Sequence, residues 1–264
     1  MISNIDYHII DKCNLNCKAC NHFCPLVSST DKGKSIEQII ADLTLLSKIK
    51  TEFSTLSILG GEPTLHPELN KILKIARDLF PDNKIHLVTN GTKYDKFDEW
   101  KKCIIENSID VWISVYPYCQ DYKERLKIIE DTLLPEVKVN YDNISEVCGF
   151  GYGFLSNKEG VVSQDELIKC IRPFKCSQLK NGKLYICNLA AQFDKLKSYF
   201  GDQVTFDLDG KEYFDLNGEI NTQELNNFIY NTFPNICYHC VDVNNNKTCK
   251  WEVSQKNINE FIET

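Results

Sequence analysis

Short apolar runs alternate with longer amphipathic stretches over the first half of the chain. Between the runs, apolar side chains recur at three- and four-residue intervals, which is the spacing of one helix face. Ser35 followed by Gln38 resembles a capping box at the start of the first such stretch. The predicted strands are Ile5–Ile10, Phe53–Leu59, Lys84–Val88, Ile109–Val115 and Glu136–Tyr141. The predicted helices are Ser35–Lys50, Pro67–Phe80, Lys93–Asn107 and Gln120–Leu134.

Strands that alternate with helices predict right-handed crossovers and a parallel sheet, so the expected fold class is α/β. The pattern breaks beyond Tyr141, where glycines and aromatic residues interleave over residues 149–154. Residues 170–250 then contain several cysteines, polar stretches and a predicted hairpin around Asn181-Gly182. We therefore predict a core over residues 1–150 and a small extension over 151–264, which metal holds together more than an apolar core does.

Composition and charge narrow the class of protein. Of the 264 residues, 42% are hydrophobic and 25% are charged, which is typical of a globular protein. The net charge is −7 and the basic residues are scattered, so we expect no nucleic-acid partner. An apolar run long enough to span a membrane and a secretory signal are both absent, which favours a cytoplasmic protein. The 13 cysteines are then expected to stay reduced, and metal ligation is favoured over disulfides.

The first cysteine motif follows directly after the first predicted strand. Cys13, Cys17 and Cys20 have C-x3-C-x2-C spacing, and three such thiolates can hold three irons of a [4Fe–4S] cube while the fourth iron stays open. Two alternatives remain open at this point. Cys24 can be a fourth thiolate of a structural zinc site, or Cys24-Pro25 can end a ferredoxin-like run in an electron carrier.

This cysteine motif, together with Gly60-Gly61-Glu62-Pro63 after the second strand, resembles the radical S-adenosylmethionine (radical SAM) enzymes. The resemblance implies a partial (β/α)6 barrel over about residues 5–145, with the [4Fe–4S] cluster on the three cysteines and S-adenosylmethionine on its open iron. One electron, from a donor such as flavodoxin or ferredoxin, would cleave the sulfonium. The resulting 5′-deoxyadenosyl radical would abstract a hydrogen atom from the substrate, so the hard chemistry belongs to the cofactor.

The residues after the second, third and fourth strands are the candidate contacts to S-adenosylmethionine. Gly60 and Gly61 allow close backbone approach to a ligand, and the Glu62 carboxylate or an adjacent carbonyl can accept hydrogen bonds from an ammonium group. By the family resemblance, Asn90 and Ser114 are expected to face the adenosyl group or its ribose.

A second set of cysteines lies in the predicted extension, at Cys170, Cys176, Cys187, Cys237 and Cys240. The set resembles the auxiliary-cluster extensions called SPASM and, in shorter form, twitch. Cys170 meets the family's spacing to the hairpin glycine and is favoured, whereas Cys176 begins the hairpin strand and remains an alternative. Either cysteine with the other three gives four thiolates, enough for a second [4Fe–4S] cluster in a twitch-like extension or for a structural zinc ion.

The expected activity is hydrogen abstraction from a small-molecule substrate, a carbohydrate, an aminocyclitol or a nucleotide-linked precursor, which is dehydrogenated or epimerised. The first cysteine motif begins at Cys13, so we expect no domain before it that binds a leader peptide. In an epimerase, a cavity thiol returns a hydrogen atom, and Cys249 is the candidate donor. The alternatives are modification of a peptide or protein side chain and a non-catalytic iron–sulfur or zinc protein.

Overall fold

A computed structural model of the protein describes residues 2–116, 122–142, 154–160, 163–170, 172–241 and 251–263. Its main sheet has the strand order β5-β4-β3-β2-β1-β7-β8-β9. The first five of these strands in chain order are parallel: β1 Ile2–Ile10, β2 Phe53–Gly60, β3 Lys84–Thr89, β4 Ile109–Ser114 and β5 Val139–Asp142. The predicted α/β class with a parallel sheet is confirmed, and in the described ranges the sheet is open, with β5 and β9 at its edges.

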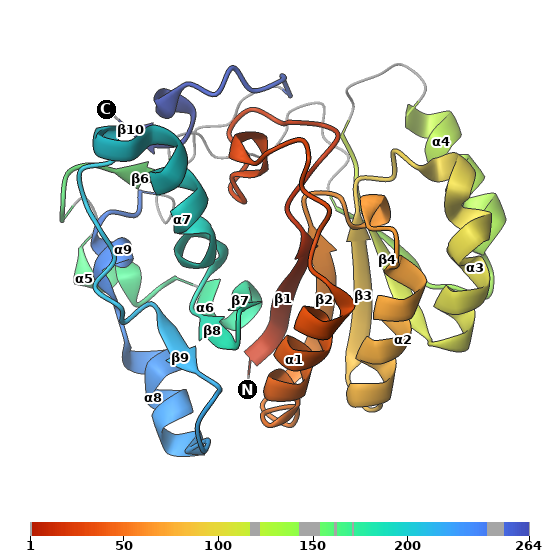
Figure 1. Ribbon diagram of the computed structural model, residues 1–264, viewed down its shortest axis with the longest axis horizontal. Helices are drawn as coiled ribbons and strands as arrows, with labels where there is room; N and C mark the ends of the chain where they lie inside the picture. The colour runs from red at the N-terminus through yellow and green to blue at the C-terminus, as the bar shows by residue number, and fades with distance from the viewer. Residues whose placement is uncertain are drawn as a thin grey trace.

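Four helices connect these strands and cover one face of the sheet (Figure 1). They are α1 Ile36–Ser47, α2 Leu69–Leu79, α3 Phe97–Glu106 and α4 Tyr122–Leu133, and each lies within a predicted helix. Ser35 and Gln38 exchange the two hydrogen bonds of a capping box, which confirms the predicted start of α1. Among the described residues, no helix is long and apolar enough to cross a membrane.

Successive residues of each strand face opposite sides of the sheet. In β1, Ile5, Tyr7 and Ile9 are fully buried on the helix side, and Asn4 and Asp6 face a cavity on the other side. The same alternation recurs in the next three strands, whose cavity-facing side chains are Thr55, Ser57, His86 and Trp112. One face of the sheet therefore packs the apolar core, and the other presents polar groups to a cavity.

The second half of the chain adds three strands to the same sheet. β7, Ser177–Lys180, pairs in parallel with the free edge of β1, and β8, Lys183–Tyr185, and β9, Tyr213–Asp215, continue the sheet in antiparallel pairs. The predicted hairpin at Asn181-Gly182 is confirmed, and both residues have a positive φ, as a tight turn between β7 and β8 requires.

The remaining elements are short or lie around the added strands (Figure 1). A two-stranded parallel sheet joins β6, Leu155–Ser156, to β10, Ile262–Glu263. The other α-helices are α5 Gln164–Leu167, α6 Arg172–Lys175, α7 Asn188–Phe200, α8 Thr222–Asn231 and α9 Asn235–Tyr238. The described 3₁₀ turns are η1 Cys24–Leu26, η2 Pro63–Leu65, η3 Tyr94–Lys96, η4 Gly201–Gln203 and η6 Ile258–Glu260.

Candidate active site

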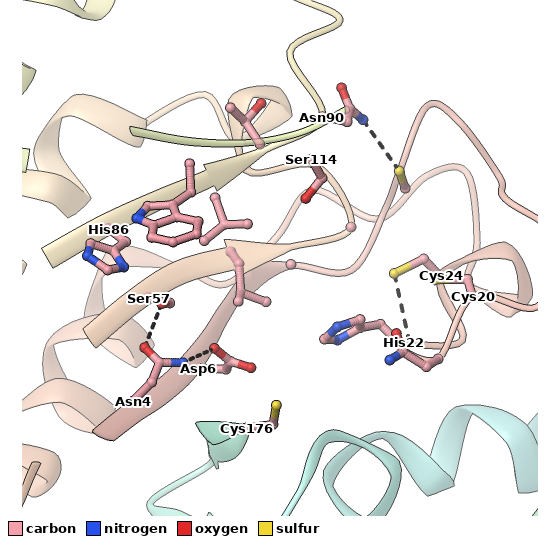
Figure 2. A pocket seen from close by; sticks show the side chains of 18 of the residues that line it. Asn4, Asp6, Cys20, His22, Cys24, Ser57, His86, Asn90, Ser114 and Cys176 are labelled. Carbon is pink, nitrogen blue, oxygen red and sulfur yellow. Dashed lines mark hydrogen bonds between the residues drawn. The ribbon is translucent and has the colours of Figure 1, made fainter. Parts of the chain in front are cut away.

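A cavity of about 710 Å³ lies against the open face of the sheet (Figure 2). Its upper part is formed by the loops that follow the carboxyl ends of the parallel strands, where α/β enzymes gather their ligands. The sequence-predicted site residues in its wall are Cys13, Cys17, Cys20, Cys176, Gly60, Gly61, Asn90 and Ser114. Loops that are distant in the sequence therefore share one cavity.

The loop after β1 carries the first three of these cysteines. Its start is fixed by Asp31, whose carboxylate accepts hydrogen bonds from the backbone N–H groups of Asp11 (2.8 Å) and Lys12 (3.0 Å). Its end is anchored by Phe23, which is fully buried and packs edge-to-face on Phe261. The loop is thus held at both ends by groups outside it, so the positions of its thiols are defined before any ligand binds.

Gly60 and Gly61 bring the loop after β2 against the cysteine loop. The Gly61 N–H donates to the Ile10 carbonyl (2.8 Å), and the next N–H, of Glu62, donates to the Lys12 carbonyl (2.9 Å). A Cβ atom at Gly60 would stand 2.0 Å from the Ile10 oxygen, and one at Gly61 would stand 2.2 Å from the Lys12 oxygen. Both glycines are therefore required for close approach between two loops of the protein, in addition to lining the cavity.

The Glu62 side chain has turned away from the cavity and is fully buried. Its carboxylate accepts hydrogen bonds from the hydroxyls of Thr64 (2.5 Å) and Thr89 (2.7 Å) and from the Asn90 N–H (2.8 Å). Burial raises the pKa of this carboxyl, and these hydrogen bonds oppose the rise. Pro63 is also buried, at the start of η2. Glu62 thus holds the turn after β3 in place, and Gly60 and Gly61 are the members of the predicted motif that reach the cavity.

Asn90 and Ser114 lie on the cavity wall at the ends of β3 and β4, where the sequence places them (Figure 2). The Asn90 amide N–H donates to Asn14 Oδ1 (3.0 Å) and approaches Cys13 Sγ at 3.8 Å. The turn after β3 is therefore in direct contact with the cysteine loop.

The thiols of the loop differ in their surroundings. Burial raises the pKa of Cys13 to about 12, whereas a hydrogen bond from the Cys24 thiol lowers the pKa of Cys20 to about 7. Nowhere in the described ranges do three His, Cys, Asp or Glu side chains lie close enough to hold one metal ion. A cubic cluster has a different requirement, because each thiolate binds a separate iron at its own corner. Three thiols around one cavity fit that requirement.

Sequence reasoning missed a chain of polar groups behind the cysteine loop. His8 is buried and its ring nitrogens bond Asp11 Oδ1 and His22 Nδ1, each at 2.8 Å. Lys195 on α7 pairs with the same Asp11 oxygen at 2.8 Å. Burial lowers the pKa of His8 to about 4; the pKa of Asp11 is raised by its own burial, but the His8 hydrogen bond and the Lys195 charge outweigh this and lower it overall.

The deeper cavity wall was also missed. Ser57 donates to Asn4 (2.7 Å) and Asn4 donates to Asp6 (2.7 Å), which makes a hydrogen-bonded row across β1 and β2. Beside it the rings of His86 and Trp112 lie 5.3 Å apart, and the Trp112 indole N–H has no hydrogen-bond partner among the described residues. Polar residues at alternate positions of predicted strands were the available signal, because both faces of a parallel sheet are usually covered and apolar.

A second cavity, of about 330 Å³, lies in the extension. Cys170, Cys187, Cys237 and Cys240 line it together with apolar side chains, and Cys176 lines the first cavity instead. Burial raises the pKa of Cys237 well above its usual range, and the neighbouring charges of Cys187, Cys240 and Cys170 raise it further. Of the two alternatives for the fourth thiol, the structure therefore brings Cys170, and not Cys176, to the other three.

Cys249, the predicted hydrogen-atom donor, lies outside the described residues, as do Cys119 and Cys148. Cys24 is buried in η1, where its thiol donates to the His22 carbonyl at 3.8 Å, and it also lines the first cavity. These placements leave the prediction for Cys249 as it stands.

The first half of the chain matches a known family model, and longer parts of it match several known proteins. Residues 7–129 match the family model of the Radical SAM superfamily. The chain is 26% identical over 170 residues to the 7,8-dihydro-6-hydroxymethylpterin dimethyltransferase of Methanocaldococcus jannaschii, covering 61% of this chain and 32% of that protein. It is 28% identical over 163 residues to an S-adenosylmethionine-dependent nucleotide dehydratase of Lacinutrix mariniflava, covering 59% and 32%. The matches thus span about a third of the length of these relatives.

Among solved structures, the crystal structure of BtrN in complex with AdoMet and 2-DOIA has a similar fold. Its TM-score is 0.57 at 14% sequence identity, and the match covers 94% of this chain and 96% of that chain. The family match begins in β1 and ends in α4, so it includes the cysteine loop, the two glycines and the turns after β3 and β4. Residues 7–129 therefore form a domain of the Radical SAM superfamily.

Proposed function

We propose that the protein is a radical SAM enzyme that abstracts a hydrogen atom from a small-molecule substrate. One observation carries this proposal: the cysteine loop, the glycine pair and a row of polar strand residues line the same cavity. A substrate on the polar wall would lie beside the loop that holds the cofactors. A solely electron-carrying iron–sulfur protein has no need of such a cavity.

Each loop that forms the upper part of the cavity has a proposed role. Cys13, Cys17 and Cys20 would hold the [4Fe–4S] cluster. Gly60 and the residues beside it would present backbone groups to S-adenosylmethionine, and Asn90 with Ser114 would contact its adenosyl part. When bound, this pair of cofactors supplies the reductive cleavage of S-adenosylmethionine and the hydrogen abstraction; the chain holds both groups in one place and excludes water from them.

The deeper cavity wall supports the proposal of a polar, ring-sized substrate. Asn4, Asp6 and Ser57 offer hydrogen-bonding groups, and Trp112 offers an indole N–H that no group in the described part of the chain accepts. The names of the two relatives refer to a pterin and to nucleotides, which are small molecules. A carbohydrate, an aminocyclitol or a nucleotide-linked compound fits such a wall. Modification of a peptide side chain remains the alternative.

The second cavity would hold an auxiliary [4Fe–4S] cluster on Cys170, Cys187, Cys237 and Cys240. Oxidation of an alcohol substrate removes one hydrogen atom, one electron and one proton, and this cluster would be the acceptor of the electron. An auxiliary cluster at this position would make the extension a twitch-like domain. The electron for the first cluster would come from a flavodoxin or ferredoxin, in the reducing setting of the cytoplasm.

Inversion of a carbon centre is a second candidate reaction, and the position of Cys176 in the first cavity favours it. A thiol there can return a hydrogen atom to the face opposite the one from which it was removed. Cys249 is the other candidate donor. The resulting thiyl radical would take one electron from the auxiliary cluster and one proton from solvent to restore the thiol.

The test begins with anaerobic reconstitution of iron and sulfide, followed by addition of S-adenosylmethionine and dithionite. We expect 5′-deoxyadenosine from the native chain and none from a variant with alanine at Cys13, Cys17 and Cys20. With candidate substrates in deuterium oxide, deuterium at a product carbon supports inversion, and a new carbonyl without deuterium supports oxidation. If the native chain holds its iron but forms no 5′-deoxyadenosine, the enzymatic proposal fails.

A further inference from the structure

A segment near the end of the described chain crosses the cysteine loop. Residues 251–254 lie antiparallel to residues 16–18, with a bridge between Val253 and Cys17. The Lys18 N–H donates to the Glu252 carbonyl, and the Ser254 N–H donates to the Asn16 carbonyl, both at 2.8 Å. We call residues 251–254 the strap. It adds a backbone partner from the far end of the chain to the loop that carries the cysteine motif.

Trp251 in the strap reaches one of the three cysteines directly. Its indole Nε1–H donates a hydrogen bond to Cys17 Sγ at a distance of 3.1 Å. Cys17 itself is buried, with 7% of its surface exposed. An indole has one hydrogen-bond donor and no acceptor, so in this contact the indole N–H donates and the sulfur accepts.

The strap is anchored on its other side by a buried carboxylate. Glu260 is 3% exposed, and its oxygens accept hydrogen bonds from the Ser254 hydroxyl (2.6 Å) and the Gln255 N–H (2.8 Å). The side chains of Lys18 and Glu252 add an ion pair at 2.7 Å, although both are partly exposed. The backbone hydrogen bonds and Glu260 therefore hold the strap against the cysteine loop independently of the indole hydrogen bond.

We propose that Trp251 raises the reduction potential of the cluster bound by Cys13, Cys17 and Cys20. The inference rests on the proposed function, which places an iron–sulfur cluster on these cysteines. Reduction adds one electron to the cluster and no bond forms or breaks; the electron comes from a low-potential donor that is itself oxidised. Part of the added negative charge resides on the ligand sulfurs, and an N–H dipole directed at one of them stabilises the reduced form.

The test compares Trp251→Phe with the native chain in a redox titration of the reconstituted cluster without S-adenosylmethionine, followed by the EPR signal of the reduced form. Phenylalanine keeps an aromatic ring but removes the N–H. We expect unchanged iron content and a lower potential, with about a tenfold lower ratio of reduced to oxidised cluster at the native midpoint, which corresponds to 59 mV for one electron. The matched control is Trp100→Phe, on α3 outside both cavities, and it should leave the potential unchanged.

The second cluster is removed from the measurement by making each comparison in a chain with alanine at Cys187, Cys237 and Cys240. An unshifted potential in Trp251→Phe, at full iron content, overturns the inference and leaves the proposed function intact. Loss of all cluster signal from the native cysteine loop would overturn the proposed function instead.

If Trp251→Phe fails to take up iron, a measurement on the native sequence decides. The chain is labelled with ¹⁵N in its tryptophan indoles, and hyperfine spectroscopy is recorded on the reduced cluster. A ¹⁵N coupling that is retained in Trp112→Phe supports the hydrogen bond, and its absence contradicts it. Trp100→Phe should retain the coupling.

Discussion

Cys170 and Cys176 lie close together in the chain, yet they line different cavities. The short helix α6 lies between them: Cys170 lines the cavity that Cys187, Cys237 and Cys240 line, and Cys176 lines the first cavity, as Asp6 does. A spacing rule favours Cys170 but cannot exclude Cys176, because both are compatible with the hairpin. The distinction depends on the direction of a short helix, which spacing does not encode.

This difference predicts opposite results for two cysteine variants. In Cys170→Ala the reconstituted chain should fall from about eight irons to about four, because a cluster in the second cavity loses one of its four ligands. Cys176→Ala is the matched control and should keep about eight irons. Iron analysis with sulfide determination measures both, and a loss of iron in Cys176→Ala alone would reverse the assignment.

The buried His8 predicts a pH dependence of stability. Its pKa falls from 6.5 to about 4 on folding, chiefly through burial, so the unfolded chain takes up a proton that the folded chain does not. The stabilisation is complete above pH 6.5 and is lost as the pH falls toward 4, by about 3 kcal/mol at 1.36 kcal/mol per pKa unit.

We therefore expect the difference in unfolding free energy between the native chain and His8→Asn to shrink by about 3 kcal/mol from pH 7 to pH 4. Urea unfolding of the iron-free chain at a series of pH values measures it. Comparing the two chains at each pH removes the contribution of titrating groups that do not contact His8. A difference that stays constant across this range would mean that His8 has the same pKa in the folded and unfolded chain, which contradicts the prediction.

Single residues also show what the sequence can and cannot predict about the site. The cysteine loop, Gly60, Gly61, Asn90 and Ser114 reach the cavity because motif spacing and strand ends determine their positions. The direction of the Glu62 side chain was not predictable. It depends on partners at Thr64 in η2 and Thr89 at the end of β3, which the fold brings together from two different segments.

At the scale of elements, Asp42 connects the helix layer to the extension. This residue of α1 accepts hydrogen bonds from the Gly182 N–H (2.8 Å) and the Tyr7 hydroxyl (3.0 Å), and it pairs with Lys34 at 2.6 Å. One buried carboxylate therefore joins α1, β1 and the β7–β8 turn. The extension is fastened to the core at this point as well as through the β1–β7 pair.

Asp42→Ala should lower the free energy of unfolding by about 3 kcal/mol, since it leaves a partly buried lysine charge and two polar groups without their acceptor. The matched control is Asp78→Ala, because Asp78 on α2 also pairs with a lysine, Lys74, but both side chains are largely exposed. That control should change stability by about 0.5 kcal/mol or less. Equal effects in the two variants, measured by urea unfolding, would contradict the connecting role of Asp42.

The elements of the first half were predictable and the sheet that unites the two halves was not. Strong periodicity and a capping box locate α1, and the apolar runs locate β1 to β5 within a few residues. The pairing of β7 with β1 joins a four-residue strand to a partner more than 150 residues away, and local pattern carries no information on such pairs. The sequence therefore indicates the β7–β8 hairpin but not its pairing with β1.

At the scale of the whole molecule, the two cavities have separate linings, with no described residue in common. We expect the two clusters to load independently, so alanine at Cys13, Cys17 and Cys20, or at Cys187, Cys237 and Cys240, should each leave about four irons. The second variant should still cleave S-adenosylmethionine with dithionite but give no oxidised product. Iron analysis and product chromatography measure this, and complete loss of iron in either variant would show that the sites depend on each other.

The interior position of β1 also affects how the chain folds as it is made. One of its edges is covered by β2, which ends at Gly60, but the other must wait for β7, which begins at Ser177. At a synthesis rate of 5–20 residues per second, that edge stays open for roughly 6–25 s. An unpaired edge invites pairing with other chains. Ribosome-bound nascent chains that end between β2 and β7 should therefore be the ones that most need a chaperone.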